Sequence, residues 1–72
     1  MSENYNRACV EALEIIKYLD PSISNQISID KIEELNNNKD PDYDFEINKN
    51  IPLYDNNFMP ETILIIRELL NL

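Results

Sequence analysis

The chain contains no glycine in its 72 residues, and this absence constrains both its turns and its chemistry. Average usage would supply about five glycines to a chain of this length. Without glycine the sequence cannot form the loops that cradle phosphates or the nucleophile elbow of α/β-hydrolases. Left-handed turns must use other residues, and asparagine tolerates that geometry best among them. We therefore predict that the asparagine clusters at 36–38, 48–50 and 56–57 form turns.

The composition also argues against catalysis. The sequence has no histidine, which excludes Ser-His-Asp and Cys-His nucleophile arrangements and zinc sites that contain histidine. Its single cysteine, Cys9, cannot form a disulfide within the chain. Because Cys9 falls on an apolar row of side chains, we interpret it as a small buried residue and not as a reactive thiolate. We expect a protein that is not an enzyme and that holds no cofactor and no metal.

The charge is strongly acidic, with 14 Asp and Glu against 6 Lys and Arg and a net charge of -8. Such a chain repels nucleic-acid phosphates and anionic membrane surfaces, so we predict no direct nucleic-acid binding and no membrane association. Residues 1–4 lack the basic and apolar regions of a signal peptide, and the aliphatic run at 63–66 is too short to span a membrane. These features predict a single cytoplasmic domain over residues 1–72.

The N-terminal third shows the periodicity of an amphipathic helix over residues 4–19, with Ser2 as its N-cap. The main apolar row is Tyr5, Cys9, Ala12, Leu13, Ile16 and Leu19. Further apolar residues, Val10, Ile15 and Tyr18, widen this face enough for two neighbours. The outer face is assigned to Asn6, Arg7, Glu11, Glu14 and Lys17. The helix should end before Asp20-Pro21, because the residue before proline avoids helical geometry.

Three further helical segments are predicted. Asp20 should cap a short helical turn that Pro21 begins, and Ser28 should cap a helix over 29–36. The last helix begins at Pro60, and its residues 63–72 are apolar except for Arg67, Glu68 and Asn71. A helix that is apolar on almost every side is buried on almost every side, and so short a chain can hardly surround it. This helix therefore indicates self-association or a C-terminal continuation.

Residues 37–59 lack a helical period. Within them Tyr43, Phe45 and Ile47 alternate with Asp42, Asp44 and Glu46, which is the period of an extended chain. The rings should pack on the helices while the acids form a ladder spaced by about 6.6–6.8 Å. A short strand at 43–47 is one option, and the proline in 51–54 confines that part to an edge or a loop. The predicted fold class is mostly α, with three or four short helices and one long extended or irregular segment at about 37–59.

Two acidic patterns are interpreted as solvated surface. Asp40, Asp42 and Asp44 have the spacing that opens an EF-hand loop, but the sixth position is Phe45 and the twelfth is Ile51, where calcium binding needs glycine and a bidentate carboxylate. The carboxylate pairs could act as acid and base only in a dry cleft, which so short a chain can hardly build. These pairs are Glu11 with Glu14, and Glu33 with Glu34.

The order of short motifs is similar to that of a known family. Asn38-Lys39-Asp40 precedes the Tyr-Asp-Phe stretch at 43–45, a Pro-Leu pair at 52–53 and a Glu-Thr-x-x-Ile-Ile helix at 61–66. This pattern resembles an uncharacterised family of small acidic bacterial proteins and covers nearly the whole chain. The resemblance implies a helical fold and no known activity. In that family the chain continues beyond the position of Leu72 through another aromatic-rich helical stretch.

These observations predict a non-enzymatic protein-protein interaction or regulatory module, which self-associates or binds a larger protein. Its four tyrosines suit an interface, since each combines an apolar ring with a polar tip. The alternative is an acidic inhibitor or antitoxin-like protein that mimics nucleic acid and blocks a basic site. The candidate partner-binding residues are Asp42, Tyr43, Asp44, Phe45, Glu46, Tyr54, Ile63, Ile66 and Leu70.

Overall fold

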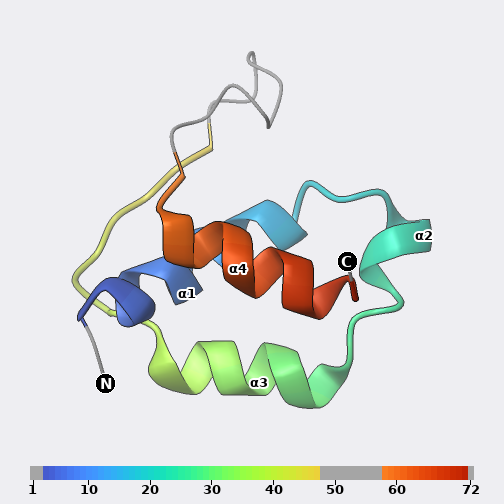
Figure 1. Cartoon of the computed structure of the whole chain (residues 1–72), viewed down its shortest axis with the longest axis horizontal. Helices are drawn as coiled ribbons and strands as arrows, with labels where there is room; N and C mark the ends of the chain where they lie inside the picture. The colour runs from blue at the N-terminus through green and yellow to red at the C-terminus, as the bar shows by residue number, and fades with distance from the viewer. Residues whose placement is uncertain (1–2, 48–57, 72) are drawn as a thin grey trace.

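Four α-helices make up most of the part of the chain that the computed structural model describes, residues 3–47 and 58–71 (Figure 1). They are α1 (Glu3–Ile16), α2 (Pro21–Ser24), α3 (Ile29–Asn38) and α4 (Pro60–Leu69). The prediction of a mostly helical fold with short helices is confirmed. Within the described ranges no strand forms, because residues 43–47 pair with no other segment. None of these helices is long and apolar enough to cross a membrane.

Helix α1 is central and packs against both α3 and α4. Its fully buried Ala8, Cys9 and Ala12 are small, so the neighbouring helices can approach closely. Leu35 of α3 and Ile65 of α4 complete this core. The prediction that the apolar face of this helix meets two neighbours is confirmed, and so is the buried position of Cys9.

Local signals set the boundaries of the first helices. Three i→i+3 hydrogen bonds follow α1, the last from Leu19 N to the Ile16 oxygen at 3.2 Å, so the chain tightens before Asp20-Pro21. The side chain of Asp20 accepts a hydrogen bond from Ser22 N at 2.9 Å, and that of Ser28 accepts one from Asp30 N at 3.2 Å. Both predicted caps are therefore confirmed. The predicted cap Ser2 lies outside the described residues.

The asparagine cluster at 36–38 does not form the turn that the sequence predicts. Helix α3 continues through Asn38, and its C-cap Lys39 is extended. The side-chain amides of Asn36 and Asn38 donate to the backbone oxygens of residues 32 and 34 at 3.1 and 2.8 Å, which supports the helix. Among residues 3–47 and 58–71, the only non-glycine residue with positive φ is Asn71, at 58°. The predicted turns at 48–50 and 56–57 lie outside the described residues.

A segment at residues 40–47, which makes a turn at 41–42 and then runs extended, leaves the end of α3 and passes beside the N-terminal end of α1 (Figure 1). We call it the acidic strap. Its first residue is fixed to α1 by a 3.0 Å hydrogen bond from Asp40 N to the Asn6 oxygen. The side chain of Asp40 then accepts a hydrogen bond from Asp42 N at 2.9 Å, which turns the chain along α1. This path directs the strap towards the start of α4.

Candidate functional site

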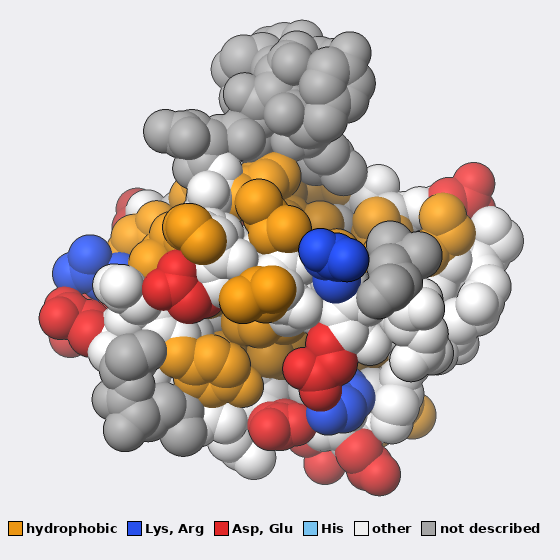
Figure 2. Space-filling model, viewed as in Figure 1, with side chains coloured by type: hydrophobic (Ala, Val, Ile, Leu, Met, Phe, Trp, Pro, Cys, Tyr) orange, Lys and Arg blue, Asp and Glu red, His pale blue; other side chains and the backbone are white. Residues whose placement is uncertain are grey.

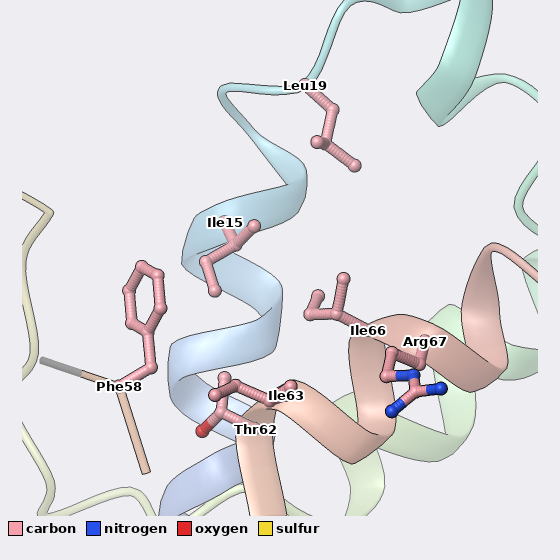
Figure 3. A pocket seen from close by; sticks show the side chains of 7 residues that line it. All are labelled: Ile15, Leu19, Phe58, Thr62, Ile63, Ile66 and Arg67. Carbon is pink, nitrogen blue, oxygen red and sulfur yellow. The ribbon is translucent and has the colours of Figure 1, made fainter. Parts of the chain in front are cut away.

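An apolar groove between the C-terminal part of α1 and one face of α4 is the candidate binding site. Its volume is about 250 Å³. The residues that line it are Ile15, Leu19, Phe58, Thr62, Ile63, Ile66 and Arg67 (Figure 3). Sites for small molecules measure about 300–1,000 Å³ and enclose most of their ligand. This smaller, open groove therefore fits a few apolar side chains of a protein better than a cofactor.

Helix α4 offers apolar surface beside the groove. Its inner residues Thr62 and Ile65 are buried, whereas Ile63 is 50% exposed and Leu64 is 64% exposed. Figure 2 shows hydrophobic side chains gathered over the middle of the molecule, where α4 lies. The prediction that so short a chain can hardly surround this apolar helix is confirmed, because Ile63 and Leu64 on its outer face stay exposed.

The acidic strap carries a row of rings to the groove. The centroids of Tyr43 and Phe45 lie 6.3 Å apart, with nearly parallel planes, and Phe45 meets Phe58 edge-on at 6.1 Å. The first distance is close to the spacing of about 6.6–6.8 Å between alternate side chains on an extended chain. The predicted alternation is confirmed, since the rings and Ile47 turn inward. The acids Asp42, Asp44 and Glu46 are exposed.

Glu11 joins three parts of the site, and its predicted position on a solvated face is wrong. The residue is only 1% exposed. Its Oε2 accepts a hydrogen bond from the Tyr43 hydroxyl at 2.7 Å. Its Oε1 accepts hydrogen bonds from Met59 N at 3.1 Å and from the Thr62 hydroxyl at 2.8 Å. The carboxylate therefore connects α1, the strap and the start of α4.

These partners explain why a carboxylate is buried in so small a protein. Burial of a charged group is unfavourable unless hydrogen bonds replace water, and three donors do so here. Met59, the N-cap of α4, makes no side-chain capping bond. Glu11 supplies both an acceptor and a negative charge at this positive end of the helix dipole. It thereby fixes Thr62, which lines the groove, and the residue after Phe58.

The sequence carries a faint signal for this burial. Ala8 and Ile15 lie at the i−3 and i+4 positions of Glu11, so Ala8, Glu11 and Ile15 form a second row with Glu11 in its middle. All three are buried against neighbouring elements. An acidic residue within a row of small apolar side chains points to a hydrogen-bonded interior position. The sequence prediction placed Glu11 on the outer face because the longer apolar row that begins at Tyr5 defined the inner face.

The environment of Tyr43 keeps its hydroxyl protonated. The hydrogen bond to Glu11 raises the pKa of Tyr43 above its ordinary value, and burial and the negative charge of Glu11 act in the same direction. The Arg7 guanidinium lies over the ring, 5.5 Å from its centroid, and opposes the shift. A protonated Tyr43 can donate to Glu11 and hold the strap against α1.

The chemistry available at the groove is that of binding. Its polar side chains are Thr62, which is already bonded to Glu11, and Arg67. Burial raises the pKa of the Cys9 thiol, which lies in the core and lines no groove wall. Within residues 3–47 and 58–71, no three His, Cys, Asp or Glu side chains come together to hold a metal ion.

The structure brings together about half of the predicted binding residues. Ile63 and Ile66 line the groove, and Tyr43 and Phe45 form the ring row that reaches it. Leu70 is the half-buried C-cap of α4 and does not line the groove. Tyr54 lies outside the described residues. The sequence missed Ile15, Leu19, Phe58, Thr62 and Arg67 in the groove, and Glu11 beneath it.

The chain matches no family model, no curated protein and no solved structure. The resemblance to small acidic bacterial proteins stays a prediction.

Proposed function

We propose that the chain is a small non-enzymatic interaction module of the bacterial cytoplasm. It binds a protein partner through the apolar groove and the acidic strap. The observation that carries this proposal is the half-exposed Ile63 in the wall of an open apolar groove on α4. Contiguous apolar surface beside an open groove is typical of sites where another protein docks.

The groove favours a helical partner. An amphipathic helix that binds in a groove inserts side chains spaced at i, i+3, i+4 and i+7. A groove of about 250 Å³ between two helices suits a few such side chains. The net charge of -8 favours a different protein with a neutral or basic surface over a second copy of the chain, since two copies would repel each other.

The experiment uses the full chain, tagged and incubated with native cytosol, with quantitative mass spectrometry of the captured proteins. We expect Ile63→Asp and Ile66→Asp to reduce capture of the specific partner by about tenfold or more, because full burial of an isoleucine contributes about 1.5–3 kcal/mol. The control is Ile29→Asp, which changes a residue 73% exposed in the first turn of α3. An acidic residue is favourable there, so capture should persist.

The oligomeric state and the fold of each variant complete this test. Sedimentation of the purified chain distinguishes a monomer that awaits a partner from a self-associated form, and circular dichroism verifies that the helices are retained. A stable monomer that captures nothing would contradict the proposal. So would equal capture by folded wild-type and Ile63→Asp chains.

The acidic strap supports a second candidate, an inhibitor that mimics nucleic acid. Asp42, Asp44 and Glu46 are exposed at alternate positions, Asp42 in the turn at 41–42 and the other two on the extended chain that follows, so an acidic ladder would run along the strap. Such a ladder could occupy a basic groove of a nucleic-acid-binding protein. Reversal of these three charges to lysine should abolish that binding. A partner retained by the reversed chain would exclude the mimic.

A further inference from the structure

Arg67 lies at the edge of the apolar groove and pairs with no carboxylate of residues 3–47 or 58–71. Arg7, Lys17 and Lys31 each pair with a carboxylate within 4.0 Å. Arg67 has no such partner among the described residues, although the chain has 14 acidic residues and only 6 basic ones. Lys39 is also unpaired there, but it does not line this groove. In the described part of the chain, the groove thus combines an apolar floor with a guanidinium that no carboxylate neutralises.

The position of Arg67 gives the groove two different ends. In Figure 3, Phe58 and Arg67 lie on opposite sides of the pocket, with Ile15 and Ile66 between them. The Phe58 side adjoins the acidic strap through the contact with Phe45. A guanidinium presents parallel N–H groups that match the two oxygens of a carboxylate, and it is more weakly hydrated than an ammonium group. The Arg67 side is therefore suited to a carboxylate that follows apolar side chains.

We propose that the occupant of the groove is an amphipathic helix of a partner protein that places one Asp or Glu side chain opposite Arg67. This inference rests on the function proposed above and defines the chemistry of the partner. The apolar side chains of the helix fill the space between Phe58 and Arg67. The remainder of the helix is neutral or basic, because a chain with a net charge of -8 repels additional acidic groups.

A structural role for Arg67 makes a different prediction. Arg67 lies in the last turn of α4, where a cation is favourable to the helix dipole. If this were its whole role, its removal would lower the stability of the chain and leave ligand preference unchanged. Measurement of both quantities on one variant separates the two roles.

The test uses synthetic helical peptides of lysine and alanine with leucine at i, i+3 and i+7. In one set, each peptide carries a single glutamate at one of the positions next to the leucines. Each peptide of the matched set carries glutamine at the same position. A third set replaces the leucines with alanine. Fluorescence anisotropy measures their binding to the full wild-type chain and to Arg67→Gln. We expect one glutamate peptide to bind wild type about two- to fivefold more tightly than its glutamine match, as ion pairs of this kind allow. Arg67→Gln should lose this preference.

The outcomes separate this inference from the proposed function. Leucine peptides that bind wild type with no glutamate preference, and that lose binding to Ile63→Asp, would support the groove and overturn the carboxylate. A glutamate preference that survives in Arg67→Gln, together with a lower melting temperature, would assign Arg67 to the helix dipole alone. Leucine peptides that bind no better than alanine peptides would overturn the proposed function itself.

Discussion

Glu11 shows how far one side chain can depart from its ordinary surroundings. Glutamate is among the residues least often buried. Its donors Tyr43, Met59 and Thr62 lie 32, 48 and 51 positions away along the chain. The neighbouring apolar row hints that Glu11 is buried, but its hydrogen-bond donors are a property of the tertiary structure, which nearby residues do not reveal.

At the scale of single residues we predict that the pKa of Tyr43 lies above the ordinary value of a tyrosine. Because Glu11 raises the pKa of Tyr43, the folded state keeps a proton that the unfolded chain releases. This contribution to stability is fully present below the unfolded pKa of about 10 and is lost as pH rises through the folded pKa. The free energy of unfolding should therefore decrease as the solution becomes strongly alkaline.

An NMR titration of the tyrosine rings measures this pKa, with Tyr43→Phe to assign the signal. Glu11→Gln removes the charge that opposes ionisation, so the pKa of Tyr43 should fall towards its ordinary value. Glu14→Gln is the control, because Glu14 pairs with Lys17 at the surface. An unchanged Tyr43 pKa in Glu11→Gln would contradict the assigned cause.

At the scale of the elements, α4 depends on α1 for the cap of its first turn. We predict that Glu11→Ala lowers the free energy of unfolding by about 1–3 kcal/mol, because it leaves buried donors without acceptors. Glu14→Ala, three positions further along α1, should have a much smaller effect because its partner is exposed. Chemical denaturation followed by circular dichroism measures both. Equal effects of the two substitutions would show that the hydrogen bonds to Glu11 contribute little.

The sequence predicted well those helix boundaries that are set by residues close to them in the chain. The caps Asp20 and Ser28 and the start at Pro60 depend on residues within one turn of each helix. The predicted alternation of inward rings and outward acids in the strap is also confirmed. Successive side chains of an extended chain point to opposite sides, whatever they pack against. The end of α3 was missed because Asn38 can either close a helix or donate back into it, and the sequence does not distinguish the two.

The groove itself could be predicted only in part. Ile63 and Ile66 were found because they stand on a helix with too much apolar surface for this chain to cover. Their opposite wall, Ile15 and Leu19, depends on how α1 and α4 lie against each other. The small residues Ala8 and Ala12 decide that approach, and their effect becomes visible only in the packed structure.

For the whole molecule, the apolar groove and the net charge of -8 predict opposite responses to salt. We expect a partner held in the groove to remain bound as sodium chloride rises from low to physiological and higher concentrations. Salt screens exposed charges over a distance of about 8–10 Å at about 0.1–0.15 M but leaves apolar contacts intact. Affinity measured across a salt series decides between the candidates. A steep loss of affinity would favour the acidic ladder as the binding surface.

The cap that α1 provides to α4 also bears on how the molecule folds. A hydrogen bond between residues 48 positions apart cannot form until the two ends of that long segment have been brought together. Closing so long a loop costs entropy before any contact compensates for it, although the cost rises slowly with length. Helix α4 therefore gains its full stability only in the finished fold. The wall of the groove should melt together with the core in one cooperative transition.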